Sequence, residues 1–384
     1  MDISENRGPE SEPEVTEAQT LEQTDKKCPA CGGTMDFDPK TGALLCPYCG
    51  NIVEIEEEDG SPARAEELSF DEAEHTGNCD WGSEKRVVVC KSCGAETVYD
   101  ASTVAGECPY CGSNQVMEAG ADGILAPGGV CPFKVTPEDA GGRFLRWLKK
   151  KLFCPSSAKK EARAGKMRGV YLPYWTFDAD TDSTYTARYG IERVVRRGKE
   201  TRVVVDWHRT SGTYHEFVND QLVSGTEKHD GSMLSGIEPF DTENNVAYKP
   251  EYIAGFASER YSVGLKAAWE KAKSFIKSRL LSHITAKIKK EHHADRVDSV
   301  NVKTAYRNIT YKYLMLPVWM SSFVYKGKVY QFMVNGQTGK VSGKAPVSPL
   351  RVAIAVFIGI VIVGLIAVAL LYGGGGGYYY LSIK

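Results

Sequence analysis

The chain has 384 residues, which is enough for one mid-sized domain with small modules attached. Its 47 basic and 49 acidic residues nearly cancel, so the molecule as a whole has no strong field that would draw it to nucleic acid or anionic lipid. A charged fraction of 25% and a hydrophobic fraction of 42% are ordinary for a globular protein, so local patterns must carry the functional signal.

The first 25 residues form an acidic stretch. They hold eight acidic side chains and a single basic one, Arg7. A secretory signal needs a basic start and an apolar run, and this stretch has neither. We expect a disordered acidic tail over residues 1–25. A role in targeting or partner binding is the alternative.

Two copies of one cysteine motif follow the tail. Eight of the 11 cysteines form four Cys-x-x-Cys pairs, and each cysteine of the second copy stands 62 positions after its counterpart. One Cys-x-x-Cys turn aims two thiolates at an ion, and two such turns complete a tetrahedron. Because all four positions are cysteine and none is open to water, we expect two structural Zn²⁺ ions. The expected metal ligands are Cys28, Cys31, Cys46 and Cys49 in the first copy, and Cys90, Cys93, Cys108 and Cys111 in the second.

The spacing within each copy resembles the zinc ribbons of TFIIB-type proteins. It predicts zinc ribbon 1 over residues 26–53 and zinc ribbon 2 over residues 85–117, joined by an acidic linker over residues 54–84. Modules this small bury little apolar surface, so metal binding supplies much of their folding free energy. Iron in a rubredoxin-like site is the alternative, although rubredoxins have a longer interval between the pairs and a core richer in aromatic residues.

Two functions fit the ribbons. One is binding of a protein partner, and the other is contact with nucleic acid through a basic face. Each ribbon has only a few lysines and arginines, and the linker between them is strongly acidic, which opposes phosphate binding. Cys79 in the linker, and Cys131 and Cys154 further along the chain, have no predicted role.

Residues 120–346 are predicted to form an α+β domain with an internal pseudo-repeat. Thr136 suits an N-cap and Pro137 suits the first helical position, so a helix begins there, with an apolar stripe that ends at Leu152. The run from 143 to 168 is strongly basic. A solvated face, contact with anionic lipid, contact with nucleic acid and docking of the acidic linker are the alternatives for this run.

Strands and one long helix fill the rest of this domain. Apolar residues recur every three or four positions over residues 265–290, which predicts a helix packed on one side. Alternating β-branched and aromatic residues predict strands before and after it, with turns at Lys326-Gly327 and Asn335-Gly336. The expected strands are 170–178, 184–189, 201–210 and 213–223 before the helix, and 299–308, 311–322, 323–325 and 328–334 after it.

A weak repeat links the two strand sets. Tyr171-Leu-Pro-Tyr-Trp175 is matched by Met315-Leu-Pro-Val-Trp319, 144 positions later. The match predicts two strand sets with a helix beside each. We expect Trp175 and Trp319 to be core anchors, because the large apolar surface of an indole is usually buried by packing in the core.

The common catalytic signatures do not occur in the sequence. It has no Gly-x-x-x-x-Gly-Lys-[Ser/Thr] phosphate loop and no Gly-x-Ser-x-Gly nucleophile elbow. His215-Glu216 is not followed by the second histidine that a zincin needs. We therefore expect no enzymatic activity, and the sequence identifies no small-molecule substrate.

An uncharged apolar segment lies near the carboxyl end. Val352–Tyr372 is long enough to cross a bilayer, so a transmembrane helix is expected over residues 350–372. Three basic residues precede it, and only Lys384 follows it, in a short Gly/Tyr tail over residues 373–384. The positive-inside bias predicts a single-pass protein of the cell membrane, with the amino-terminal side in the cytoplasm and the tail outside. The basic residues before the helix are Lys340, Lys344 and Arg351.

Taken as a whole, the chain resembles a family of uncharacterised bacterial membrane proteins that carry TFIIB-type double zinc ribbons. The eight cysteines and the segments GVYLPYWTFDAD and LPVWMSSFVYKGKVYQFMVNGQTGKV carry this resemblance. The resemblance implies an architecture and not an activity. We expect a non-enzymatic binding or adaptor module on the cytoplasmic face, with a protein partner, and with membrane lipid contacted by helix 352–372 and by the basic run 143–168. A nucleic-acid-binding protein tethered to the membrane is the alternative.

Overall fold

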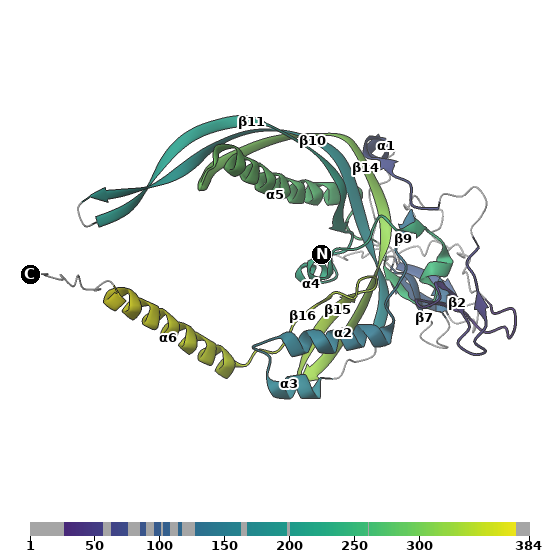
Figure 1. The fold of residues 1–384 in the computed structure, drawn as a ribbon. Helices are drawn as coiled ribbons and strands as arrows, with labels where there is room; N and C mark the ends of the chain where they lie inside the picture. The colour runs from purple at the N-terminus through teal and green to yellow at the C-terminus, as the bar shows by residue number, and fades with distance from the viewer. Residues whose placement is uncertain are drawn as a thin grey trace, which may run out of the picture.

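The structure is a computed structural model whose described residues are 27–56, 63–75, 127–162, 167–197, 200–259 and 261–373, with the backbone of four short strands between residues 85 and 116 (Figure 1). The predicted acidic tail, Cys79, the second cysteine quartet and most of the predicted Gly/Tyr tail lie outside these residues. The four short strands are β5 (Lys85–Val89), β6 (Glu96–Asp100), β7 (Thr103–Glu107) and β8 (Asn114–Val116).

Two strands of 30 residues each form the centre of the fold. β10 (Arg168–Arg197) and β14 (Arg296–Tyr325) pair antiparallel over most of their length. β11 (Glu200–Ser224) adds to the outer edge of β10, and β15 (Lys328–Asn335) adds to the outer edge of β14. Because β-strands twist, the sheet bends into the arc seen in Figure 1, with α5 (Leu265–His292) along its inner side.

The sequence predicted more and shorter strands than the fold contains. The breaks expected at 179–183 and 211–212 are wrong, because both segments continue within one β10–β11 hairpin. Gly212 lies opposite Tyr185, and a Cβ on it would meet the Tyr185 Oη at 2.7 Å. The glycine therefore makes room for an aromatic ring on a continuous strand.

Two β-bulges interrupt the regular pairing of the long strands β10 and β14. The register between β10 and β14 shifts between Asp178 and Asp180 and again between Thr186 and Arg188. Facing these shifts on β14, Asn308 and Ser299 have positive φ angles of 50° and 54°. A bulge bends its strand and increases the local twist, so β14 curves where a break at 309–310 was expected.

The predicted long helix is confirmed as α5, which continues to His292. Its buried face packs on β10, β11 and β14. Burying one such aliphatic side chain contributes about 1.5–3 kcal/mol, so this stripe is a main source of stability for the arc. The buried residues are Leu265, Ala268, Trp269, Ala272, Ile276, Leu280, Ile284 and Ile288.

The domain contains the same β-α-β-β unit twice. The first unit comprises β9, α2, β10 and β11, and the second comprises β13, α5, β14 and β15. The short strand of each unit pairs in parallel with the long strand of the other, β9 with β14 and β13 with β10. The two segments predicted to be repeats lie opposite each other, with Pro173 facing Met315. The elements of these units not yet introduced are β9 (Gly129–Val130), α2 (Pro137–Lys150) and β13 (Ala257–Glu259).

The two tryptophans link the units in a matching way. Trp175 on β10 donates its indole N–H to the Val263 carbonyl at 2.9 Å, just before α5. Trp319 on β14 donates to the Val135 carbonyl at 2.8 Å, just before α2. Both rings are buried, so the prediction that they are core anchors is confirmed. Each indole holds the start of the helix that belongs to the other unit.

The middle of the sheet is buried on both faces. Leu172 and Tyr174 of β10 face a cluster that includes α4, whereas Tyr171 and Trp175 face the cluster that includes α2 and α5. Both faces are therefore covered by helices. The remaining elements here are α4 (Gly231–Ile237), β12 (Val246–Ala247), η1 (Pro250–Ile253) and β16 (Val341–Gly343).

Helix α2 begins as predicted and ends earlier than predicted. The Thr136 hydroxyl accepts a hydrogen bond from the Asp139 N–H at 3.2 Å, and Phe144 stacks on Phe332 with ring centroids 3.6 Å apart. Leu152, expected on the apolar stripe, lies beyond the helix and is 79% exposed. The stripe prediction is wrong at this residue because the helix stops at Lys150. A short helix, α3 (Ser156–Glu161), follows.

Part of the predicted acidic linker packs on the sheet. β4 (Leu68–Ser69) pairs with β14, and α1 (Phe70–His75) follows it. Phe70 is buried against Phe177 and Trp269. The linker therefore contacts the centre of the sheet, whereas docking on the basic run 143–168 was the alternative that the sequence suggested.

Helix α6 (Pro349–Gly373) leaves the body of the molecule next to α2 and α3 (Figure 1). Its segment Pro349–Ala369 has a mean hydropathy of 3.1 and no part of it is buried. It is long and apolar enough to cross a membrane. In Figure 1 this helix and the strand β2 lie at opposite ends of the molecule.

Candidate metal centre

A small sheet carries the first cysteine unit. Its strands are short, and its hairpins place two Cys-x-x-Cys-Gly turns side by side. In each turn the glycine N–H donates to the carbonyl of the first cysteine, Gly32 to Cys28 at 2.8 Å and Gly50 to Cys46 at 2.9 Å. Both glycines have positive φ, 72° and 75°, which explains glycine at these positions. The strands are β1 (Asp36–Asp38), β2 (Ala43–Leu45) and β3 (Ile52–Val53).

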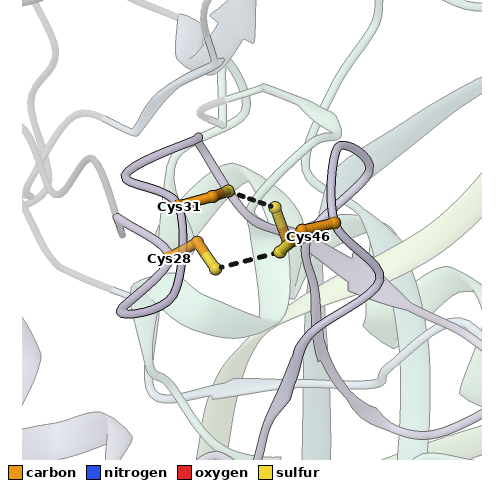
Figure 2. Close-up of side chains that lie close together, drawn as sticks. Cys28, Cys31 and Cys46 are labelled. Atoms are coloured by element: carbon orange, nitrogen blue, oxygen red, sulfur yellow. Dashed lines mark hydrogen bonds between the residues drawn. The ribbon is translucent and has the colours of Figure 1, made fainter.

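The four thiols of this unit converge on one point. The Sγ atoms of Cys28, Cys31, Cys46 and Cys49 all lie within 4.8 Å of one another. The Sγ atoms of Cys28 and Cys49 are 3.6 Å apart, and those of Cys31 and Cys46 are 3.5 Å apart. Figure 2 shows the sulfurs of the two turns pointing toward each other. A tetrahedral Zn²⁺ with Zn–S bonds of about 2.3 Å needs sulfurs about 3.8 Å apart, so the quartet fits this ion.

Backbone amides favour the thiolate form at the first cysteine of each turn. Burial opposes ionisation of Cys28, but the backbone amides of Cys31 and Ala30 outweigh it and lower the pKa of the thiol to about 6. For Cys46 burial again opposes ionisation, and the amides of Cys49 and Tyr48 lower the pKa. The same amides stabilise sulfur when a metal holds it as a thiolate.

The second cysteine of each turn, Cys31 or Cys49, has a pKa above its ordinary value. The amide of Asn51 favours ionisation of Cys49, but the sulfurs of Cys31 and Cys28 raise the pKa of the thiol to about 12. Metal binding to the quartet therefore releases protons, and affinity for metal rises with pH.

This quartet is a closed site. Cys28 and Cys46 are buried, and they pack with Met35, Phe37 and Leu44 in the main core cluster. All four ligands come from the protein, so the geometry suits a structural ion and leaves no position for a substrate. The second quartet (Cys90, Cys93, Cys108, Cys111) lies outside the described residues, and the second ion stays a prediction.

The cysteine unit is joined to the α+β domain. The Phe37 N–H donates to the Ala254 carbonyl at 3.1 Å, and the Phe37 ring meets Tyr252 edge to face. These contacts connect metal binding to the η1 segment that precedes β13. Nothing in the sequence pattern indicated this contact, because the residues are more than 200 positions apart.

A charge network around the buried Lys312 was also missed. The side chain of Lys312 on β14 is 9% exposed, and its Nζ lies 2.9 Å from Asp220 Oδ1 and 3.2 Å from Glu67 Oε1. Asp178 accepts a hydrogen bond from the Asp220 N–H at 2.6 Å. Burial raises the pKa of Asp178 to about 6. Burial opposes ionisation of Glu67 too, but its hydrogen bond to Lys312 keeps the pKa of this carboxyl below its ordinary value.

Sequence comparisons give one informative relative. The chain is 31% identical over 335 residues to the uncharacterized protein YdjG of Bacillus subtilis (strain 168), which covers 85% of this chain and 91% of the relative. No family model and no solved structure matches the chain.

Proposed function

This chain belongs to the family of the Bacillus subtilis protein YdjG, and on that premise we propose that it is a membrane-anchored adaptor that binds a protein partner without catalysing a reaction. In this proposal both cysteine units are TFIIB-type zinc ribbons with one structural Zn²⁺ each. The helix α6 spans the cell membrane once and leaves the folded part in the cytoplasm, as the basic residues before it favour.

The observation that carries the proposal is the free end of the β10–β11 hairpin. Pairing of β10 with β14 stops at Gly190, and α5 ends at His292. Beyond these points the two strands continue as a ribbon over residues 191–197 and 200–206, here called the overhang. At ~3.4 Å per residue, seven residues make it about 24 Å long. Within the described part of the chain no third strand forms a backbone ladder with it. At its base, the Glu192 N–H donates to the Asp295 carboxylate at 2.7 Å and the Glu192 carboxylate pairs with Arg296.

The overhang exposes apolar side chains. Val194 and Val203, which face each other across the strands, are 68% and 57% exposed. Ile191 and Val204 are also exposed, and arginines stand among them. A two-stranded ribbon is only marginally stable in water, and apolar residues mixed with arginine are typical of protein interfaces. A partner that adds a strand to its edge would satisfy both its backbone and these side chains.

The rest of the molecule supports the same function. The described cysteine quartet suits a structural ion, and α6 supplies an anchor at the other end of the fold. Nucleic-acid binding has weaker support. On the described surface of the first cysteine unit, the positive charges of Lys27 and Lys40 are balanced by the negative charges of Asp36 and Asp38, so this surface offers no basic face to phosphate. A closed metal site, an apolar helix that can serve as an anchor and a free ribbon together favour a binding module over an enzyme.

The test uses the full-length protein captured from its own membranes in mild detergent. Val194→Ser with Val203→Ser is compared with Val324→Ser with Val329→Ser, another directly facing valine pair, in which both residues are 64% exposed. We expect the overhang variant to lose at least tenfold of a co-purifying protein, and the control variant to keep it. Equal recovery from both variants, or a bound species removed by nuclease, would contradict the adaptor proposal.

A further inference from the structure

The start of α6 holds the turn between α2 and α3 in place. The Arg351 guanidinium donates from Nη1 to the carbonyls of Leu152 at 3.0 Å and Cys154 at 2.9 Å, and Nη2 hydrogen-bonds to the Ser156 hydroxyl. The Ser348 N–H donates to the Phe153 carbonyl at 2.8 Å. This set of bonds fixes residues 151–155, here called the α2–α3 turn, beside the point where the apolar helix begins.

Two apolar side chains of this turn face outward. Leu152 is 79% exposed and Phe153 is 43% exposed. Leu350, on the first turn of α6, is 70% exposed as well. Because the membrane-crossing segment starts at Pro349, all three lie at the level where the helix enters a bilayer. Apolar side chains at that level lose their contact with water by entering the acyl boundary.

Basic side chains surround the apolar pair. The last turn of α2 exposes Lys149 and Lys150, and Lys151 follows with its Nζ 4.5 Å from the centre of the Trp147 ring. On α3, the Lys159 ammonium donates to the Lys149 carbonyl at 2.8 Å, which keeps that charge on the same side. Lysines and a tryptophan around exposed apolar residues are the composition of a membrane-surface segment.

We propose that the α2–α3 turn and its flanking lysines form a binding surface for anionic phospholipid headgroups of the membrane that α6 crosses. The apolar pair enters the acyl boundary while the ammonium groups meet phosphates above it. A nucleic acid would leave Leu152 and Phe153 exposed, so charge and apolar surface together favour lipid. This inference needs α6 in a membrane and does not depend on the adaptor role of the overhang.

A structural consequence follows for the orientation of the domain. A single spanning helix joined to a flexible chain would let the domain rotate freely. Arg351 instead connects the helix to α2 and α3, and a lipid contact on the turn adds a second fixed point. The domain then stands on the membrane in one orientation, with the cysteine unit directed away from the surface (Figure 1).

The experiment measures hydrogen–deuterium exchange of the full-length protein in nanodiscs. Discs of phosphatidylcholine alone are compared with discs that contain phosphatidylglycerol, at low and at high salt. The test variant is Lys149→Gln with Lys150→Gln. Its matched control is Lys289→Gln with Lys290→Gln, because that pair occupies the last turn of α5 in the same way.

We expect exchange over residues 149–160 to slow in the anionic discs and to recover at high salt. Each lysine near an anionic surface changes binding by about fivefold, so the test variant should lose most of the protection and the control none. Equal exchange in both kinds of disc, or the same loss in both variants, would overturn the proposal. So would unchanged protection in a test variant that instead loses binding to nucleic acid. The Val194→Ser/Val203→Ser variant should keep the lipid effect, which separates this result from the adaptor test.

Discussion

The two β-α-β-β units start their helices in the same way and end them differently. In both units an indole from the other unit binds the carbonyl just before the helix. Helix α5 then runs for 28 residues to His292 and is followed by His293 with a φ of 49°, whereas α2 has 14 residues and is followed by an extended turn that Arg351 holds by hydrogen bonds. The difference shows how the two copies of one unit have different tasks: α5 supports the long sheet, whereas the turn after α2 contacts the apolar helix α6.

The largest expected effect comes from the metal, because the cysteine unit contacts Tyr252 and Ala254 in the η1 segment that leads into the second unit. Cys46→Ser removes one thiolate from a four-thiolate site, and metal binding supplies on the order of 10 kcal/mol of folding free energy in modules of this kind. We expect loss of one equivalent of zinc by elemental analysis and fast hydrogen exchange over residues 27–53. Exchange should also rise over 250–254 and stay unchanged in α2. Tyr48→Ala, at a residue that is 77% exposed, is the control.

Substituting the tryptophans tests most directly whether each unit holds the start of the other unit's helix. Trp175→Ala and Trp319→Ala each remove a buried indole, which costs about 3–5 kcal/mol. We expect Trp175→Ala to raise hydrogen exchange at the start of α5, and Trp319→Ala to raise it at the start of α2. If each substitution instead loosened the helix of its own unit, the matching roles of the two indoles would be wrong.

The buried carboxyl of Asp178 makes the stability of the protein depend on pH. Asp178 ionises near pH 4 when unfolded and near pH 6 when folded, so between these values the folded state holds more protons. Its contribution to the free energy of unfolding therefore falls as the pH rises from 4 to 6. Glu67 acts in the opposite direction, because its folded pKa is lowered.

Asp178→Asn keeps an acceptor for the Asp220 N–H and removes this titration. We compare the free energy of unfolding of the variant with that of the unmodified protein. We expect the difference to shift in favour of the variant by about 1–3 kcal/mol as the pH rises from 4 to 6. Thermal unfolding of the full-length protein in detergent at both pH values measures the difference. Ser322, at the 144-residue offset in the other unit, carries no charge, and Ser322→Ala should give a profile parallel to that of the unmodified protein. A parallel profile for Asp178→Asn would contradict the pKa assigned to Asp178.

The smallest expected effect concerns the helix starts. Thr136 caps α2 with its hydroxyl, and the matching residue before α5 is Gly264, which has no side chain for this purpose. Thr136→Ala should lower the free energy of unfolding by about 1 kcal/mol. Thr136→Ser keeps the hydroxyl and should restore most of it. An equal loss in both variants, measured by denaturant unfolding, would mean that packing and not the cap fixes this helix start.

Local signals in the sequence predicted local structure. The α2 start, the α5 stripe, the turn at Lys326-Gly327 and the first cysteine quartet all depend on residues a few positions apart. Two features could not be predicted: the pairing of each unit's short strand with the other unit's long strand, and the ion pair of Glu67 with Lys312. Both depend on residues far apart in the chain, and no local pattern in a single sequence reports such contacts. The strand lengths were wrong because polar residues such as Asp180 and Asp182 lie on one continuous strand, where neighbouring strands supply their partners. Asp180 accepts a hydrogen bond from Asn308 of β14, and Asp182 pairs with His215 of β11.

The bulges at Ser299 and Asn308 have a further consequence for solubility. Before Thr310, the outer edge of β14 has no neighbouring strand among the described residues. A flat edge of that length would offer a row of amides and carbonyls to another copy of the chain and so promote aggregation. The two left-handed residues interrupt this row and turn the edge out of a single plane, so the same feature that curves the sheet also protects the protein from edge-to-edge association.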